Sequence, residues 1–197
     1  MTANNALIRS FIAIELPAEV TTKLEQIQNI LKSPRYDFVK WVPASNIHIT
    51  LKFLGNIRPT KIDDVVAVMD RISRTYSPFE LEIGDIGAFP NLNNPRVLWI
   101  GVDGDIDKLR ALQTSLEDGL AGVGFAKELR AFTPHLTLAR LREHISPADR
   151  REFSELITRK SPRVSHRFLV TALSLMRSQL QSSGAVYTRI AETKLGQ

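Results

Sequence analysis

The sequence predicts an α+β fold in which antiparallel β-sheet is covered by helices on one face. Two observations lead to this expectation: β-like runs occur as neighbouring pairs, and amphipathic helical segments separate the pairs. Size is the third observation, because 197 residues with 43% hydrophobic side chains suffice to bury a core. The chain has no cysteine, which excludes disulfide frameworks, thiol nucleophiles and thiolate metal sites. We therefore expect a single domain over residues 1–197.

The first half of the chain begins with a β-strand that leads into a helix. Pro17 separates a run of β-forming residues from a segment in which apolar residues recur at helical spacing. A turn sequence, Pro43-Ala44-Ser45, then divides two short β-like runs, and Pro59 suits the start of the next helix. In order, the expected elements are a strand at 7–16, a helix at 20–31, β-like runs at 37–42 and 46–55, and a helix from about 59 to 72.

The second half continues the same alternation of paired strands and helices. A loop rich in Pro and Asn at 90–95 joins two strands, and the glycines of 119–124 end the helix that follows them. Those glycines do not form a phosphate-binding loop, because such a loop precedes its helix and ends in Gly-Lys-Ser/Thr. In order, the expected elements are strands at 79–89 and 96–102, a helix from 104 to about 119, a strand at 134–141, a helix at 147–159, and β-like runs at 164–176 and 185–191.

Positive charge is concentrated in one segment of the chain. Residues 127–167 contain ten Lys and Arg against five Asp and Glu, which accounts for the whole formal net charge of +5. Such a segment attracts polyanions, although a solvated helix face has the same composition. No apolar run approaches the length of a membrane span or forms a signal peptide. We therefore expect no membrane contact and a cytoplasmic location.

A short motif occurs twice and carries the functional prediction. Residues 48–51 read His-Ile-Thr-Leu and residues 135–138 read His-Leu-Thr-Leu, in a protein with four histidines. Successive side chains of a strand point to opposite faces, so His48 and Thr50 share one face, and His135 and Thr137 share another. By the same alternation Ile47, Ile49, Leu51 and Phe53 take the apolar face. If the two strands meet, two imidazoles and two hydroxyls line one groove.

This arrangement suits acid–base chemistry at phosphorus. Imidazole titrates near neutrality, so a neutral ring accepts a proton from an attacking group while a charged ring protonates the leaving oxygen. The threonine hydroxyls then donate to the non-bridging oxygens. The structural alternative is a pair of half-buried strands with polar faces. A two-histidine metal site is a further alternative, but neither copy carries a nearby Asp, Glu or Cys as a third ligand.

The chain resembles the two-histidine (2H) phosphoesterases, and most closely the RNA 2′,3′-cyclic phosphodiesterases, which are also called 2′-5′ RNA ligases. Besides the two HxTx motifs, the resemblance rests on flanking segments across most of the chain: Arg9 to Pro17, Trp41-Val42, Ile47 to Gly55, Pro95 to Val102, and Phe132 to Arg140. It implies a bilobal fold, with two pseudo-symmetric lobes of antiparallel sheet and outer helices around a central cleft.

The resemblance also implies an activity and residue roles. The implied reaction opens an RNA 2′,3′-cyclic phosphate to a 2′-phosphate without a metal or cofactor. His48 is then the proton donor and His135 the proton acceptor, while Thr50, Thr137 and Arg140 bind the substrate phosphate. The partner is RNA or a nucleotide with a 2′,3′-cyclic phosphate, and the expected state is a monomer. The residues alone do not distinguish the two imidazoles.

Three further residues leave alternatives open. Strict alternation from His135 places Arg140 on the opposite face, so only a bulge or the strand's end turns it toward the motif. Lys52 shares the His48 face and either meets phosphate or is a solvated lysine at the rim. Phe11 either stacks on a base or belongs to the core. His144 and His166 lie in polar, Arg-rich surroundings, so we expect them at the surface.

Two other functions remain compatible with the sequence. One is reversible 2′-5′ joining of RNA ends, such as tRNA halves, by the same groups. The other is a catalytically idle module that binds nucleotides or RNA. Binding alone does not require two titratable groups, so the paired histidines favour an enzyme.

Overall fold

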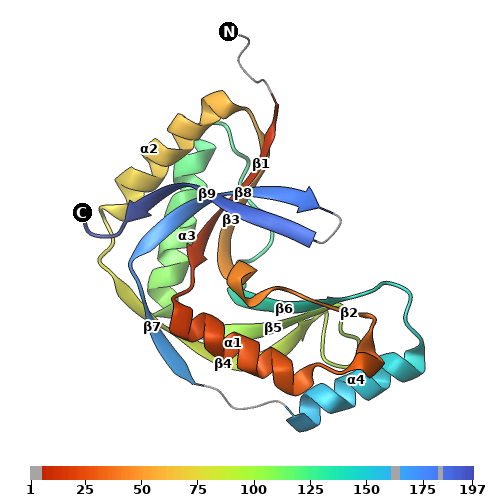
Figure 1. Ribbon diagram of the computed structural model, residues 1–197. Helices are drawn as coiled ribbons and strands as arrows, with labels where there is room; N and C mark the ends of the chain where they lie inside the picture. Colours follow the sequence, from red (N-terminus) through yellow and green to blue (C-terminus); the bar gives the residue numbers. More distant parts are fainter. Residues whose placement is uncertain (1–5, 161–164, 182–183) are drawn as a thin grey trace.

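The computed structural model describes residues 6–160, 165–181 and 184–197 (Figure 1). Its strands agree with the sequence in position, apart from the run at 164–176. The strands are β1 (Ile8–Glu15), β2 (Val39–Trp41), β3 (His48–Ile57), β4 (Phe79–Phe89), β5 (Val97–Gly104), β6 (His135–Leu141), β7 (His166–Val170), β8 (Ala172–Gln181) and β9 (Gly184–Lys194). The α-helices in the described residues are α1 (Ala18–Leu31), α2 (Ile62–Ser73), α3 (Ile106–Ala121) and α4 (Pro147–Lys160). As expected, α3 ends among glycines, with Gly122 as its C-cap.

The β-like run predicted at 164–176 corresponds to two separate strands in the structure. The run at 164–176 is divided at Thr171, between β7 and β8, and its first residue, Val164, lies outside the described residues. β7 pairs with β4 and β8 pairs with β1, so the two strands lie far apart in the order of the sheet. Periodicity does not reveal this break, because both strands are similarly apolar and a single residue separates them.

The nine strands of the described residues form one antiparallel sheet whose two halves meet at the motif strands. The order is β7-β4-β5-β6-β3-β1-β8-β9, and β2 pairs with β6 beside this path. The halves are therefore β7, β4, β5 and β6 on one side and β3, β1, β8 and β9 on the other. They join where β3 lies antiparallel to β6, with Ile49 opposite Leu136. These are the residues between His and Thr in the two motifs, so the junction relates the two copies by a local twofold.

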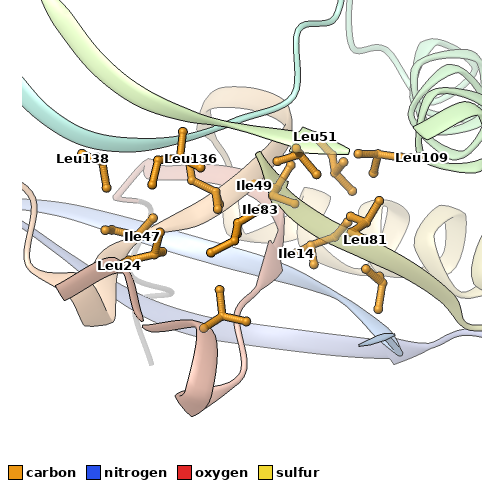
Figure 2. Packing of buried hydrophobic residues seen from close by; sticks show 14 of the residues in the cluster. Ile14, Leu24, Ile47, Ile49, Leu51, Leu81, Ile83, Leu109, Leu136 and Leu138 are labelled. Atoms are coloured by element: carbon orange, nitrogen blue, oxygen red, sulfur yellow. The ribbon is translucent and has the colours of Figure 1, made fainter. Parts of the chain in front are cut away.

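The helices cover the face of the sheet that points away from the histidines. α1 packs beside α4 and α2 beside α3, as Figure 1 also shows. α3 contacts β3, and α2 contacts β8 and β9. The apolar residues of all four helices join the strand residues in one buried core. In Figure 2, Ile49, Leu51, Leu136 and Leu138 lie in this core together with side chains from α1 and α3. The expectation of an α+β fold with helices on one face is confirmed.

Both motif strands contain a β-bulge immediately after the threonine. Opposite β1, Thr50 pairs with Ala13 but Lys52 pairs with Ile12, so Leu51 is the extra residue. Opposite β5, Thr137 pairs with Trp99 but Ala139 pairs with Leu98, so Leu138 is the extra residue. An extra residue interrupts the two-residue period, and every side chain after it changes face.

The bulge at Leu51 corrects two predictions made from strict alternation. Phe53 does not take the apolar face, and its side chain is 66% exposed on the His48 side, where its ring lies 6.2 Å from that of Phe11. Lys52 is neither a phosphate contact nor a solvated rim lysine. It is only 6% exposed and points to the helix side of the sheet.

Lys52 is part of a buried ion pair with α3. Its Nζ lies 2.6 Å from Glu117 Oε2 and also donates to the carbonyl of Ala126 at 2.6 Å. The same carboxylate oxygen accepts the backbone N–H of Glu128 at 3.0 Å. Each charge is therefore paired and hydrogen-bonded, the condition under which a buried ion pair is tolerated. The pair fixes β3 to α3 directly behind the bulge.

We predict that Lys52→Met lowers the free energy of unfolding by about 3–5 kcal/mol, because it leaves the Glu117 carboxylate buried without its cation. Urea denaturation measures the loss. Adding Glu117→Gln removes the stranded charge and should restore part of the stability.

Lys61→Met is the matched control, because Lys61 pairs with Asp64 at 2.8 Å where both side chains are about half exposed. Exposed pairs contribute up to about 1 kcal/mol. If Lys52→Met and Lys61→Met lose the same free energy of unfolding, burial does not make the Lys52 ion pair more costly to break than an exposed one.

Candidate active site

The two motifs come together on the open face of the sheet. Ile49 and Leu136 pair across β3 and β6 and point into the core, so the His and Thr on either side of each point to the other face. The antiparallel register brings His48 toward Thr137 and His135 toward Thr50. All four side chains are half-buried, neither sealed in the core nor fully solvated. The two imidazoles and two hydroxyls therefore lie on one face of the sheet, at the junction of the halves.

Backbone carbonyls fix the orientation of both imidazoles in the same way. Nδ1 of His48 lies 2.8 Å from the carbonyl oxygen of Asn46, and Nδ1 of His135 lies 2.7 Å from that of Thr133. A carbonyl only accepts, so each Nδ1 carries the hydrogen and each Nε2 is left for chemistry. Nε2 of His48 lies 3.0 Å from the Thr50 hydroxyl oxygen, on the open face. Each anchoring carbonyl is two residues before its histidine, so the repeat includes the support of the ring.

His48 is enclosed by aromatic rings and stands beside a carboxylate. Phe11 stacks on its imidazole with ring centroids 4.7 Å apart, and Tyr187 meets it edge-on at 5.2 Å. Phe11 is only 3% exposed. Its ring therefore packs against the His48 imidazole and is not free to stack on a nucleobase. Glu15 is the direct cross-strand partner of His48 in β1. Its Oε1 accepts hydrogen bonds from Ser174 and, at 2.7 Å, from Nε of Arg189.

These surroundings act on the proton affinity of His48 in opposite directions. Burial lowers the pKa of the imidazole, whereas the hydrogen bond to Asn46 and the negative charge of Glu15 raise it. A positive charge on His135 lowers it again, and the net direction is downward. For Glu15, burial raises the carboxyl pKa, but the hydrogen bonds from Arg189 and Ser174 outweigh it and hold that pKa below its usual value. Glu15 therefore remains an anion next to His48.

His135 has aromatic neighbours but a cation in place of the carboxylate. Phe89 meets its ring edge-on at 5.0 Å, and Trp99 lies at 6.3 Å. Trp99 lies flat against Gly87, where any Cβ would come within 2.2 Å of the indole. Burial lowers the pKa of His135, the hydrogen bond to Thr133 opposes this, and the charge of Arg140 lowers it further.

Arg140 reaches the motif face because of the bulge at Leu138. The bulge shifts the alternation by one, so Ala139 and Leu141 are buried and Arg140 is exposed on the side of His135. A buried glutamine on α1 holds this bulge from behind. Nε2 of Gln28, a residue only 1% exposed, donates to the carbonyls of Leu138 at 3.0 Å and Val42 at 2.7 Å.

The sequence matches the model of the 2′-5′ RNA ligase superfamily over residues 16–181. This chain belongs to that superfamily. It is 35% identical to the RNA 2′,3′-cyclic phosphodiesterase of Methanothermobacter thermautotrophicus, with 92% of this chain and 95% of that protein covered. It is 34% identical to the enzyme of the same name from Aquifex aeolicus, with 80% and 82% covered.

Solved structures of two other proteins share the fold of this superfamily member. The chain superposes on TT0787 of Thermus thermophilus with a TM-score of 0.79 and 28% identity, covering 96% of this chain and 98% of that one. It superposes on E. coli LigT complexed with 3′-AMP with a TM-score of 0.77 and 28% identity, covering 97% and 99%. The predicted family and the predicted fold class are confirmed.

Several residues beside the motifs of this superfamily member cannot be recognised from the sequence alone. Glu15, Tyr187 and Phe53 all lie beside His48 or Phe11, yet no local pattern marks them. Only strand pairing and the bulge bring them there. Of the two histidines outside the motifs, His144 is exposed as expected, whereas His166 is half-buried at the start of β7.

Other features of this superfamily member lie away from the motif face. One hollow of about 460 Å³ lies beside α1 and is lined by residues including Trp41, and another of about 910 Å³ lies along α4. Neither hollow is lined by a residue of the two motifs. No cluster of three or more potential metal ligands occurs within the described ranges. No helix in the described part of the chain is long and apolar enough to cross a membrane.

We predict that Gln28→Met lowers the free energy of unfolding by about 1–3 kcal/mol, because the partly buried carbonyl of Val42 loses the side-chain donor that Gln28 provides. Gln26→Met is the control, since Gln26 is exposed on the same helix. Urea denaturation of both variants measures the difference. A loss no greater than that of the control would show that Gln28 does not support the bulged strand.

Proposed function

We propose that the protein hydrolyses the 2′,3′-cyclic phosphate end of RNA to a 2′-phosphate by two-histidine acid–base catalysis. The observation that carries this proposal is the pair of imidazoles held by backbone carbonyls at Nδ1, on one open face of two adjoining strands. Two histidines of opposite protonation state on either side of a phosphorus atom supply both proton transfers of the reaction.

In the proposed mechanism His135 is the base and His48 is the acid. Neutral His135 takes a proton at Nε2 from water as the water oxygen attacks phosphorus. The bond from phosphorus to the 3′ oxygen breaks, and His48 delivers its Nε2 proton to that oxygen. Thr50 and Thr137 donate hydroxyl hydrogen bonds to the non-bridging oxygens, and Arg140 balances their growing negative charge. The product carries the phosphate on the 2′ oxygen.

Local charge supports this assignment of roles. His48 stands beside the Glu15 carboxylate, which favours its protonated form, whereas His135 is near the Arg140 guanidinium, which favours its neutral form. Backbone carbonyls hold the two imidazoles in the same way. We therefore assign the proton donor and the proton acceptor from the charged neighbours. The roles reverse if the reaction runs backward.

The relatives support the proposed substrate class. The matched proteins of Methanothermobacter and Aquifex are named RNA 2′,3′-cyclic phosphodiesterases, and LigT has been solved with 3′-AMP. The name of the superfamily favours reversible 2′-5′ joining of RNA ends as the second candidate activity. Incubating cyclic-phosphate and 5′-hydroxyl RNA ends, followed by a search for joined product, distinguishes it from hydrolysis alone. A monomeric state, a cytoplasmic location and a single domain belong to the proposal as well.

We predict that His48→Ala and His135→Ala each lower turnover of a 2′,3′-cyclic mononucleotide by about 10²–10⁴-fold, because each removes one proton transfer. The assay contains EDTA and resolves 2′- from 3′-phosphate products. Circular dichroism checks that the variants remain folded.

The surface variant His144→Ala is the control and should keep normal turnover. Wild-type activity that EDTA abolishes, or normal turnover by either motif variant, would refute the mechanism. Binding of nucleotides without turnover by the wild type would favour the idle module.

We predict that Glu15→Gln moves the basic limb of the pH–rate profile to lower pH. Removing the anion makes the imidazolium of His48 less stable, so its pKa falls and the acid loses its proton at lower pH. The other groups around His48 are His135, Tyr187 and Arg189; freeing Arg189 from Glu15 acts in the same direction.

Glu192→Gln is the control for this pH shift, because Glu192 also pairs with Arg189, at 2.8 Å, but is not the cross-strand partner of His48. The measurement is kcat/KM for a cyclic mononucleotide across pH. An unmoved basic limb in Glu15→Gln, with turnover lowered equally at all pH values, would show that Glu15 has only a structural role.

A further inference from the structure

Two exposed cations are paired across strands at the end of the motif groove. Lys40 in β2 lies directly opposite Arg140 in β6. Val39 and Trp41, on either side of Lys40, belong to or pack against the core, as do Ala139 and Leu141 on either side of Arg140. Because neighbouring side chains of a strand take opposite faces, both cations lie on the face of His135 and Thr137.

β2 takes the place beside β6 that β3 occupies at the motifs. β3 pairs with β6 at Leu136, and β2 pairs with it from Ala139 to Leu141. Along β6, the cross-strand pairs on this face therefore begin with the histidines and threonines of the motifs and end with Lys40 and Arg140. On the other side of Arg140, its cross-strand partner in β5 is Val97, and the partner of Val97 in β4 is Phe89. Both residues are uncharged.

This cation pair has no acidic partner. Neither Lys40 nor Arg140 forms an ion pair with any of the described residues, and the stretches outside them, 1–5, 161–164 and 182–183, contain no Asp or Glu. Like charges directly opposite each other in a sheet are destabilising. Such a pair is stabilised when an anion binds between or above the two side chains.

We propose that Lys40, beside Arg140, binds the phosphodiester that precedes the reacting nucleotide in an RNA chain, while Arg140 keeps its role at the reacting phosphate. This inference rests on the proposed function, in which the reactive cyclic phosphate occupies the histidines. A cyclic mononucleotide has no second phosphate, whereas an RNA end has one on the 5′ oxygen of its last nucleotide. Lys40 then makes the site more effective on oligonucleotides than on mononucleotides.

The test compares a 2′,3′-cyclic mononucleotide with a dinucleotide ending in the same cyclic phosphate. In Lys40→Met, kcat/KM for the dinucleotide should fall about three- to tenfold more than for the mononucleotide, which corresponds to one phosphate contact of a partly exposed cation. The salt dependence of log kcat/KM for the dinucleotide should become shallower by about 0.7, the value for one contact with a single strand. Lys40→Arg should keep most of the wild-type preference.

A dinucleotide with a neutral methylphosphonate in place of its internal phosphodiester isolates the charge. The ratio of kcat/KM for this substrate to kcat/KM for the mononucleotide should be the same in wild type and in Lys40→Met. Lys23→Met is the matched control, because Lys23 is exposed on α1 and should leave all substrates unaffected. Equal losses on mononucleotide and dinucleotide, or no loss on either, would overturn the proposal.

A binding measurement separates failure of this inference from failure of the proposed function. Calorimetry with the dinucleotide 2′-phosphate, the product of the reaction, needs no turnover. Weaker binding of this ligand to Lys40→Met than to wild type, with a smaller loss for the mononucleotide 2′-phosphate, supports the second phosphate site even if hydrolysis is absent. Equal binding by both proteins overturns it even if hydrolysis occurs.

Discussion

The pairing of β3 with β6 is the constraint on which the rest of the site depends. Ile49 and Leu136 are 87 residues apart in sequence, yet their pairing joins the two halves of the sheet and orients both motifs. Their burial on the helix side forces the histidines and threonines to the open side, because strand alternation allows no other choice. Hydrophobic packing behind the sheet thus determines how the polar side chains of the motifs are arranged in front of it.

The bulges make the two halves differ although their motifs match. Each bulge turns the residue three positions after the threonine toward the groove, which gives Phe53 in one half and Arg140 in the other. The residue just before it faces the helices and is a lysine in one case and an alanine in the other. Lys52 accordingly requires Glu117 on α3, whereas the bulge in β6 is held by the neutral amide of Gln28. The bulge therefore adds an aromatic ring on the side of His48 and a cation on the side of His135.

Sequence periodicity predicted the elements and the motif face well but failed where it assumed a constant period. The HxTx repeat, the apolar residues between its members and the helical stripes are local patterns, and the structure confirms them. A bulge has no comparable local signature, so Lys52 and Phe53 were assigned to the wrong faces. Glu15 and Lys40 owe their positions to strand register between distant segments, which one sequence does not reveal.

The difference between the halves resolves a problem that a symmetric site would have. Two equivalent imidazoles a short distance apart titrate as a coupled pair, and nothing then decides which one holds the single proton. In this protein Glu15 is fixed as an anion by Ser174 and Arg189 on the side of His48, while Arg140 lies on the side of His135. In the proposed mechanism these two charges favour the proton on His48 and the neutral form of His135. The repeated strands thus give the two histidines matched backbone supports, and under the proposed mechanism the neighbours that are not repeated set the direction of proton transfer.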